Sequence, residues 1–331
     1  MISILECSPN PSDATSYYRT RGVLPFLVRE HSTELRFSYL QKYLRSTWSD
    51  IAAFDVIFIQ RPTTQYDYDF ILMCRRMNKI IWLDYDDLHT DIPPSNPVYH
   101  VNPDGGKWML KCSEMATFIT CSTPAIQEKI LGVNKHAYVV KNAHNDYIYS
   151  HKQLQKDGLT KRPKVIWRGG VTHEEDIFQY REQIREVVER YPFRMFGGVS
   201  HYTKRDLGLQ EDEHISGLPL EEYLNYIVQY NPAFMIYPLV DNPFNKAKSN
   251  ISALEAIYSG AICIVPYGFE EFNGTAILSS NFIEAIEMLS DVDTFKSVRE
   301  LHVKKMFEDQ VLSKTNEKRY KILKHYTDLM I

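Results

Sequence analysis

The chain has 331 residues, 44% of them hydrophobic and 24% charged, with a formal net charge of −4. Because this length is about twice that of a usual single domain, we expect two domains that share a cleft. The charge gives no overall attraction to nucleic acid, although a local basic cleft would survive that average. No stretch approaches the roughly 20 apolar residues that cross a bilayer, which argues against a membrane-spanning helix.

The amino-terminal stretch and the cysteines indicate the compartment. The first residues carry the acidic Glu6 and no basic leader, so we expect a first strand there and not a signal peptide. The five cysteines are scattered without a C-x-x-C spacing, and several fall in apolar runs. Such cysteines are typical of the reduced core of an intracellular protein, so the expected location is cytoplasmic.

The first candidate ligand contact follows the first expected strand, Ile2 to Cys7. The next stretch, through Gly22, is polar and rich in turn formers. A loop after the first strand of an open α/β sheet lies at the ligand crevice. Arg19 in this loop is therefore a candidate contact for a phosphate or an acceptor. The alternative is a solvated or structurally paired arginine.

A cluster of carboxylates ends another expected strand. A strand at 54–60 and a helix at 68–77 precede an apolar run that starts at Lys79 and ends in Asp84, Asp86 and Asp87. Carboxylate oxygens are ligands for hard cations, so a metal site is one interpretation. Binding of acceptor hydroxyls and capping of the next helix are the others.

A change of composition separates the two expected domains. A strand at 118–121 and a helix that begins near Pro124 follow in the first domain. Residues 146–163 then lose periodicity and become polar, which predicts a linker with a boundary near 155–163.

The second domain begins with a strand that ends at Arg168, followed by Gly169 and Gly170. Glycines let a backbone approach a ligand closely, and an arginine at a strand end can neutralise a diphosphate. The alternative is a tight turn with a surface arginine. His173 follows, and either reaches the donor phosphate or sugar or simply starts a helix. Gly198 ends the next strand, where it again allows a ligand near the backbone.

The stretch from Pro232 to Phe272 carries the strongest nucleotide signal. It predicts a strand at 234–238, a polar loop at 241–249, a helix at 250–259 stopped by a glycine, and a strand at 261–266. If Ser249 or Asn250 caps the helix, the free N–H groups of Asn250 to Ala253, that of Ile251 included, point at one spot, which suits a diphosphate. Lys248 adds charge, and Glu255, one turn into the helix, can accept two ribose hydroxyls.

The same stretches resemble a known family. The run G-L-P-L-E-E-Y-L from Gly217, the Tyr-Pro at Tyr237, and S-A-L-E-A-I-Y-S-G-A-I-C-I-V-P around Glu255 resemble retaining glycosyltransferases of the two-domain GT-B fold, the family 4 type found in bacteria and bacteriophages. The resemblance implies two Rossmann-like domains facing across a cleft, an acceptor-side domain at 1–155, a nucleotide-sugar domain at 163–311, and a carboxyl-terminal helix at 312–331 that crosses back to the first domain. It also implies that Glu255 binds the ribose and the helix start holds the diphosphate.

Two positions depart from the family pattern. The family often has a glutamate eight positions before the second one, and this chain has Ala247 there, which puts the usual sugar contact in doubt. Arg168 stands in a shortened version of the family's G-R-x-x-x-K-G loop and is expected to replace both basic groups. Since the family holds its nucleotide without an essential metal, we expect none.

The sequence therefore predicts transfer of a sugar from a nucleotide-diphosphate sugar, most simply a UDP-sugar, to an acceptor hydroxyl, with retention and with no other cofactor. The catalytic candidates are Arg168, Lys248 and His173. The expected acceptor is a glycan or a lipid-linked glycan. The alternatives are a hydroxymethylated base in bacteriophage DNA, and a nucleotide-sugar-binding protein that has lost catalysis. Hydrolysis of a nucleotide sugar without acceptor would exclude the last.

Overall fold

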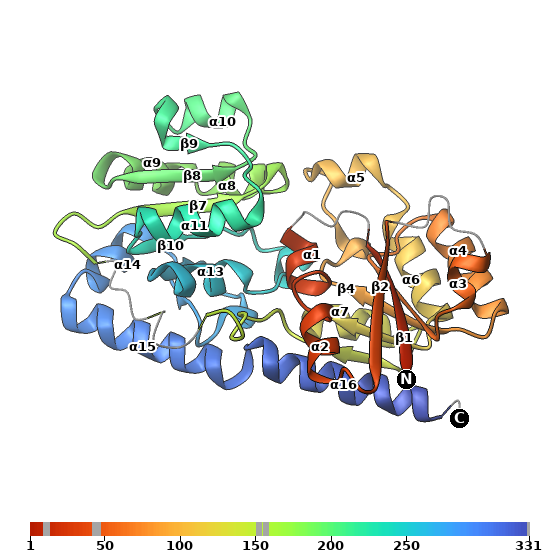
Figure 1. The fold of residues 1–331 in the computed structure, drawn as a ribbon. Coiled ribbons are helices and arrows are strands. Elements are labelled where there is room, and N and C mark those ends of the chain that lie inside the picture. Colours follow the sequence, from red (N-terminus) through yellow and green to blue (C-terminus); the bar gives the residue numbers. More distant parts are fainter. Residues whose placement is uncertain (9–13, 42–47, 150–153, 155–158, 330–331) are drawn as a thin grey trace.

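The computed structural model describes residues 1–8, 14–41, 48–149, 154 and 159–329. It contains two six-stranded sheets, ordered β2-β1-β3-β4-β5-β6 and β12-β11-β10-β7-β8-β9, in which each strand pairs in parallel with its neighbours. Helices lie between the strands in sequence, and the two sheets sit side by side in separate halves of the molecule (Figure 1). The expected pair of Rossmann-like domains is confirmed.

Within the part of the chain that the structure describes, the first half contains six strands and seven α-helices. The strands are β1 (Ile2–Ser8), β2 (Leu35–Gln41), β3 (Val56–Gln60), β4 (Ile80–Tyr85), β5 (Phe118–Cys121) and β6 (Ala137–Val139). The helices are α1 (Ala14–Arg19), α2 (Leu24–Glu30), α3 (Trp48–Ala52), α4 (Gln65–Arg76), α5 (Pro97–Val101), α6 (Gly105–Met115) and α7 (Pro124–Leu131).

The second half has the same plan. Its strands are β7 (Val165–Gly169), β8 (Phe193–Gly197), β9 (His214–Ile215), β10 (Phe234–Ile236), β11 (Ile262–Val265) and β12 (Ile277–Leu278). Its helices are α8 (Glu174–Gln179), α9 (Arg181–Arg190), α10 (His201–Asp206), α11 (Leu220–Tyr230), α12 (Pro243–Lys246), α13 (Ile251–Ser259), α14 (Phe282–Leu289) and α15 (Val292–Asp309), followed by α16 (Leu312–Asp328).

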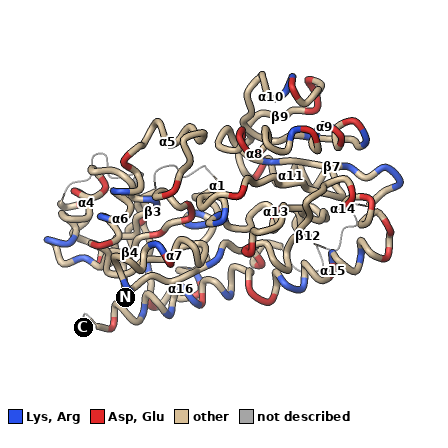
Figure 2. The backbone as a smooth tube through the Cα atoms, turned by 180° about the vertical axis from the view of Figure 1, so that it is seen from behind, with Lys and Arg blue, Asp and Glu red and all other residues tan. Residues whose placement is uncertain are grey.

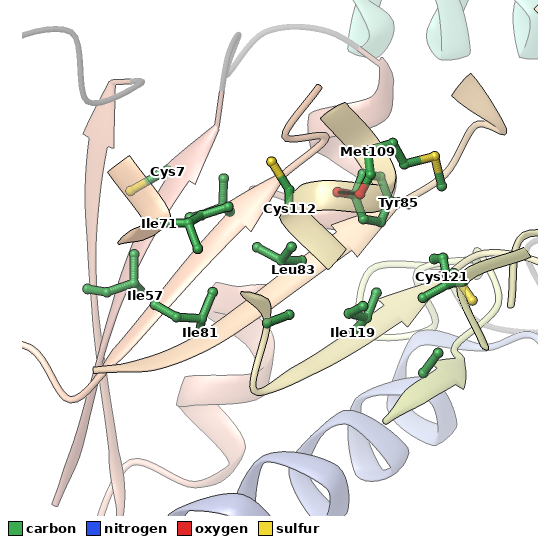
Figure 3. Packing of buried hydrophobic residues seen from close by; sticks show 14 of the residues in the cluster. Cys7, Ile57, Ile71, Ile81, Leu83, Tyr85, Met109, Cys112, Ile119 and Cys121 are labelled. Carbon is green, nitrogen blue, oxygen red and sulfur yellow. Dashed lines mark hydrogen bonds between the residues drawn. The ribbon is translucent and has the colours of Figure 1, made fainter. Parts of the chain in front are cut away.

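Strand side chains alternate between two apolar layers in the first domain. Ile57 and Ile59 of β3 join a cluster with α4, α6 and α7, part of which is drawn in Figure 3. Val56 and Phe58 of the same strand face the opposite layer, with α2 and α16. This period of two buries both faces of the sheet, which is why its strands read as continuous apolar runs.

The last helix returns to the first domain. Helices α15 and α16 run along one side of both halves, and α16 ends near β1 (Figure 1). Leu323 and Tyr326 of α16 lie in the first domain's core, where the Tyr326 ring stacks on Phe118 at 4.8 Å. The predicted return of this helix is confirmed.

Several local expectations need correction. Part of the presumed loop after β1 is helix α1, strand β2 was not predicted, and the polar loop at 241–249 contains the short helix α12. Thr123 occupies the N-cap position of α7, but its hydroxyl donates to the Ala247 carbonyl oxygen at 2.9 Å and makes no capping hydrogen bond. The predicted linker falls partly outside the described residues, which omit 150–153 and 155–158.

All five cysteines are buried and unpaired, as expected for core thiols. Among the described residues no helix is both long and apolar enough to cross a bilayer.

Candidate functional site

Two adjoining cavities lie beyond the carboxyl ends of the strands, where open α/β sheets bind ligands. The glycine-lined cavity, of about 390 Å³, is bounded by the ends of β7 and β8 and by α11 and α13. The interdomain cavity, of about 460 Å³, is bounded by residues from both domains. Arg168, Gly170 and Ala14 line both, so the two cavities meet at the end of β7.

The glycines at the strand ends shape the first cavity. Gly169, Gly170 and Gly198 line it, as does Gly197, the neighbour of Gly198 at the end of β8. Gly197 has a φ of +112°, and a Cβ atom there would lie 1.7 Å from the Gly169 carbonyl oxygen. Only glycine fits this close approach of β7 and β8, which leaves backbone exposed to the cavity.

Arg168 and Glu255 form a bidentate ion pair in the wall between the cavities. The Arg168 Nε lies 2.5 Å from Glu255 Oε2 and its Nη2 lies 2.7 Å from Oε1. Burial alone would lower the pKa of Arg168, but the adjacent carboxylate raises it, so the guanidinium stays charged. Two tyrosines also donate to this carboxylate: Tyr18 of the first domain to Oε1 at 3.0 Å, and Tyr223 of α11 to Oε2 at 3.1 Å.

The start of α13 faces the interdomain cavity through Ser249 and Ile251, with the half-buried Lys248 beside them. Ser249 Oγ accepts from Asn142 Nδ2 of the first domain at 2.8 Å. Asn250 holds the N-cap position without a side-chain cap, because its side chain bonds elsewhere, to Thr275 and Gln310. The backbone N–H groups of the first turn are therefore not occupied by an Asn250 cap.

His173 lines the interdomain cavity from the second domain. Its Nδ1 lies 2.7 Å from Asp176 Oδ2, and Asp176 Oδ1 in turn accepts from the Val240 N–H at 2.8 Å and from Asn245 Nδ2 at 2.7 Å. Burial lowers the pKa of His173, and the Lys248 ammonium lowers it further. The imidazole is thus held in a fixed orientation with its Nε2 toward Tyr237, 3.3 Å away.

The first domain contributes an acidic wall to the interdomain cavity. Arg61, just after β3, binds Asp86 through two nitrogens and Asp87 through Nη2 at 2.8 Å. Burial raises the pKa of Asp86. Burial also acts to raise that of Asp87, but Arg61 and Lys248 outweigh it and bring its pKa to about 2. Burial and Arg61 lower the pKa of His89 to about 4, so this ring is neutral near pH 7.

Two predicted acceptor-side residues lie elsewhere. Arg19 pairs with Asp84 at 2.7 and 2.8 Å, and each side chain is only 1% exposed. Arg19 also donates to Asn142 and to the Val140 carbonyl oxygen. Neither Arg19 nor Asp84 lines the two cavities, so the geometry favours the interpretation of Arg19 as a structurally paired arginine.

The departure at Ala247 has a structural counterpart. This residue is buried in the first domain's apolar cluster together with Phe244 of α12. A short helix thus packs across the domain boundary at the position where the family often carries a glutamate.

The structure brings most of the predicted residues together. The two cavities are lined by Arg168, Glu255, His173, Lys248, Ser249, Ile251, Asp86, Asp87, Gly169, Gly170 and Gly198. Three predicted residues do not line them: Asn250, Arg19 and Asp84. Sequence reasoning missed Tyr18, Tyr223, Arg61 and His89. Two signals were available: Arg61 directly follows an apolar strand, and Tyr223 lies in the run from Gly217 that carries part of the resemblance. Among the described residues, no group of three or more His, Cys, Asp or Glu side chains is arranged to hold a metal.

The fold is shared with several solved structures. The HepE protein of Anabaena in complex with UDP has a TM-score of 0.66 and 12% identity, over 98% of this chain and 100% of that one. An alpha-glucosyltransferase in complex with UDP-glucose and DNA containing an abasic site has a TM-score of 0.64 and 11% identity, over 98% and 99%. The chain has the GT-B fold.

A similar fold also carries another activity. A putative UDP-N-acetylglucosamine 2-epimerase from Listeria monocytogenes has a TM-score of 0.59 and 11% identity, over 99% of this chain and 97% of that one. At these identities the likeness shows the fold, and the function has to be argued from the site. No protein-family model and no curated protein matches the chain.

Proposed function

We propose that this protein is a glycosyltransferase that moves a sugar from a nucleotide-diphosphate sugar, with UDP as the nucleotide, to an acceptor hydroxyl. The observation that carries the proposal is the position of Arg168. It lies where the glycine-lined and interdomain cavities meet, on Glu255 and near the start of α13. In such a donor the diphosphate joins the nucleoside to the sugar. If the nucleoside and the sugar occupy the two cavities, the diphosphate lies where the cavities meet, next to Arg168.

The donor fits the two cavities in one orientation. The nucleoside occupies the glycine-lined cavity, where Phe196, Leu218 and Leu220 offer apolar surface and Glu255 accepts ribose hydroxyls. The diphosphate lies at the start of α13, whose free N–H groups and helix dipole favour anions. The sugar then enters the interdomain cavity. The UDP bound to structures that share the fold supports uridine as the nucleoside.

The reaction breaks the bond between the sugar C1 and the diphosphate oxygen and forms a bond from C1 to the acceptor oxygen. Charge grows on the leaving diphosphate, so the main demand is electrostatic stabilisation. Lys248, Arg168 and the α13 start supply it, and the neutral His173, whose Nδ1–H donates to Asp176 and whose Nε2 faces the Tyr237 hydroxyl, lines the same cavity. The acceptor proton passes to the leaving diphosphate, so no protein base is required. This arrangement on one face of the sugar accords with retention.

The acceptor we propose is a neutral carbohydrate hydroxyl. The first-domain wall presents Asp86 and Asp87 against a single guanidinium, that of Arg61, beside the neutral His89. Carboxylates accept hydrogen bonds from sugar hydroxyls, whereas this wall repels the phosphates of a DNA strand. Acidic and basic residues also alternate along α15 and α16, where they form ion pairs such as Lys305–Asp309 at 2.8 Å (Figure 2).

The proposal is tested by ligand-induced thermal stabilisation followed by turnover. UDP and one UDP-sugar are expected to raise the Tm, since a ligand that binds only the folded state stabilises it by mass action. The stabilising donor is then incubated with glycans, with hydroxymethylated DNA and with no acceptor. Transfer to a glycan supports the proposal, and transfer to DNA replaces the acceptor. Binding without hydrolysis or transfer identifies an inactive binding protein, and no shift with any nucleotide overturns the proposal.

A further inference from the structure

The Glu255 carboxylate has no free acceptor position in the structure. Its Oε1 accepts from Tyr18 and from Arg168 Nη2, and its Oε2 accepts from Tyr223 and from Arg168 Nε. A carboxylate offers about four lone-pair sites, two on each oxygen. A ribose cannot place two further hydroxyl donors on Glu255 until two of the present donors leave.

The four donors differ in how readily they can leave. Tyr18 and Tyr223 are buried, with 6% and 8% of their surface exposed; Tyr18 lines neither cavity, and Tyr223 lines only the glycine-lined one. The Arg168 side chain is 20% exposed and lines both cavities. A guanidinium binds phosphate in the same bidentate manner as carboxylate, so an arriving phosphate gives Arg168 an equivalent partner.

The geometry points to an exchange of partners at Glu255, an inference that rests on the proposed function. We propose that the donor diphosphate draws Arg168 away from Glu255 and that the two ribose hydroxyls take the vacated positions. The numbers match, because Arg168 donates once to each carboxylate oxygen and a ribose offers two hydroxyls. Tyr18 and Tyr223 keep their bonds and hold the carboxylate in place throughout.

The exchange makes the site selective for an intact nucleoside diphosphate. A nucleoside alone must displace Arg168 from Glu255 and leave the guanidinium without an anion. A phosphate alone removes Arg168 and leaves the buried Glu255 short of two donors. Each half of the ligand therefore opens the position that the other half needs, and by linkage the two must raise each other's affinity by the same factor.

The coupling is measurable on the wild-type protein with the two halves supplied separately. Uridine is titrated calorimetrically with and without saturating inorganic phosphate, at constant ionic strength. We expect phosphate to raise the affinity for uridine about tenfold, within the usual range of coupling between sites. The control is 2′,3′-dideoxyuridine, which lacks both hydroxyls and whose affinity phosphate should leave unchanged.

A variant provides the second measurement. Arg168→Ala removes the competitor, so it should bind uridine more tightly than wild type does and should no longer respond to phosphate. If phosphate leaves the uridine affinity of the wild type unchanged while UDP binds, the exchange is wrong and the proposed donor site stands. If phosphate raises the affinity for dideoxyuridine equally, the coupling does not involve the hydroxyls and the exchange is also wrong. If UDP itself does not bind, the proposed function fails.

Discussion

Two arginine–carboxylate pairs with nearly the same geometry occupy different environments in this protein. Arg19 and Asp84 meet in the interior of the first domain, and Arg168 and Glu255 meet at a cavity wall in the second. Both pairs are bidentate, at 2.7–2.8 Å and 2.5–2.7 Å. The first arginine is 1% exposed and the second 20%. Two ion pairs of similar geometry therefore have different roles. The Arg19–Asp84 pair stabilises the core, whereas the Arg168–Glu255 pair can change partners.

The surroundings of the two pairs explain this division. Arg19 is held by further bonds to Asn142 and to the Val140 carbonyl oxygen, and Thr120 donates to Asp84 at 2.6 Å. No arriving ligand can replace such a set of partners. Arg168 has space on its open side, where an anion can approach.

Arg19→Ala should have the largest effect, on stability. It leaves Asp84 buried without its cation, and breaking a buried pair in this way costs about 3–5 kcal/mol. Chemical denaturation would measure the loss in free energy of unfolding. Arg36→Ala, which changes an exposed arginine of the same domain, serves as the control and should change it by less than about 0.5 kcal/mol. Similar values for the two variants would mean that Arg19 is not a core residue.

Arg168→Ala should act mainly on activity. Removing a charged donor from a developing oxyanion lowers the rate by about 10²- to 10³-fold, and we expect that loss in kcat with a weaker affinity for UDP. Steady-state kinetics with the stabilising UDP-sugar would measure it. Arg168→Lys keeps the charge but not the bidentate geometry and should retain part of the rate. Wild-type turnover by Arg168→Ala would remove this residue from the site.

Glu6 is a third buried carboxylate beside an arginine, but its arginine partner is more exposed than Arg19 or Arg168. It is fully buried, and among the described residues its ion-pair contact is Arg21 at 3.1 Å, whose side chain is 33% exposed. Burial raises its pKa from 4.5 to about 7, although Arg21 opposes the shift. A folded-state pKa above the unfolded value means that this contribution to stability is complete below pH 4.5 and is lost as the pH rises through 7.

The resulting pH dependence can be isolated with Glu6→Gln. Between pH 5.5 and pH 8 the wild type should lose about 2 kcal/mol of unfolding free energy more than the variant does. Denaturation of both proteins at the two pH values gives the difference. Parallel changes in the two proteins would show that Glu6 ionises normally.

Tyr18→Phe and Tyr223→Phe should have the smallest effects. Each removes one hydrogen bond from Glu255, on different oxygens and from different domains. A hydrogen bond of this kind contributes about 1–1.5 kcal/mol, so each variant should bind UDP roughly five- to tenfold more weakly. Calorimetric titration measures both. An unchanged affinity in both variants would show that the tyrosines do not hold the carboxylate.

The fold was predicted from the sequence more accurately than the side-chain contacts of the site were. Strand β5 matches the predicted limits, and Gly260 ends α13 in the left-handed conformation expected of a helix-stopping glycine, with a φ of 90°. Such features depend on local periodicity and on glycine geometry, which the sequence displays directly. Strand β2 was missed although Leu35, Phe37 and Tyr39 alternate with polar residues, the period of two that indicates a strand.

The site was predicted in outline because parallel strands bring their carboxyl ends to one edge. Arg168, Asp86 and Asp87 were placed on this basis, and Glu255 was placed by its position one turn into a helix that follows such a strand end. The depth of a side chain, however, is a property of tertiary packing. Asp84 lies two residues before Asp86 and is sealed in the core, and no local pattern separates the two. The contact of Tyr18 with Glu255 joins residues 237 positions apart, which a single sequence does not reveal.

The central claim is that Glu255 and Arg168 bind one nucleoside diphosphate. The most direct test is calorimetric titration of UDP into the wild type and into Glu255→Gln, with 2′-deoxy-UDP as a second ligand. We predict that UDP binds the wild type, that Glu255→Gln weakens this binding at least about tenfold, and that removing the 2′-hydroxyl weakens binding to the wild type much more than to the variant. Absence of UDP binding to the wild type, or equal affinities for UDP in the two proteins, would contradict the account.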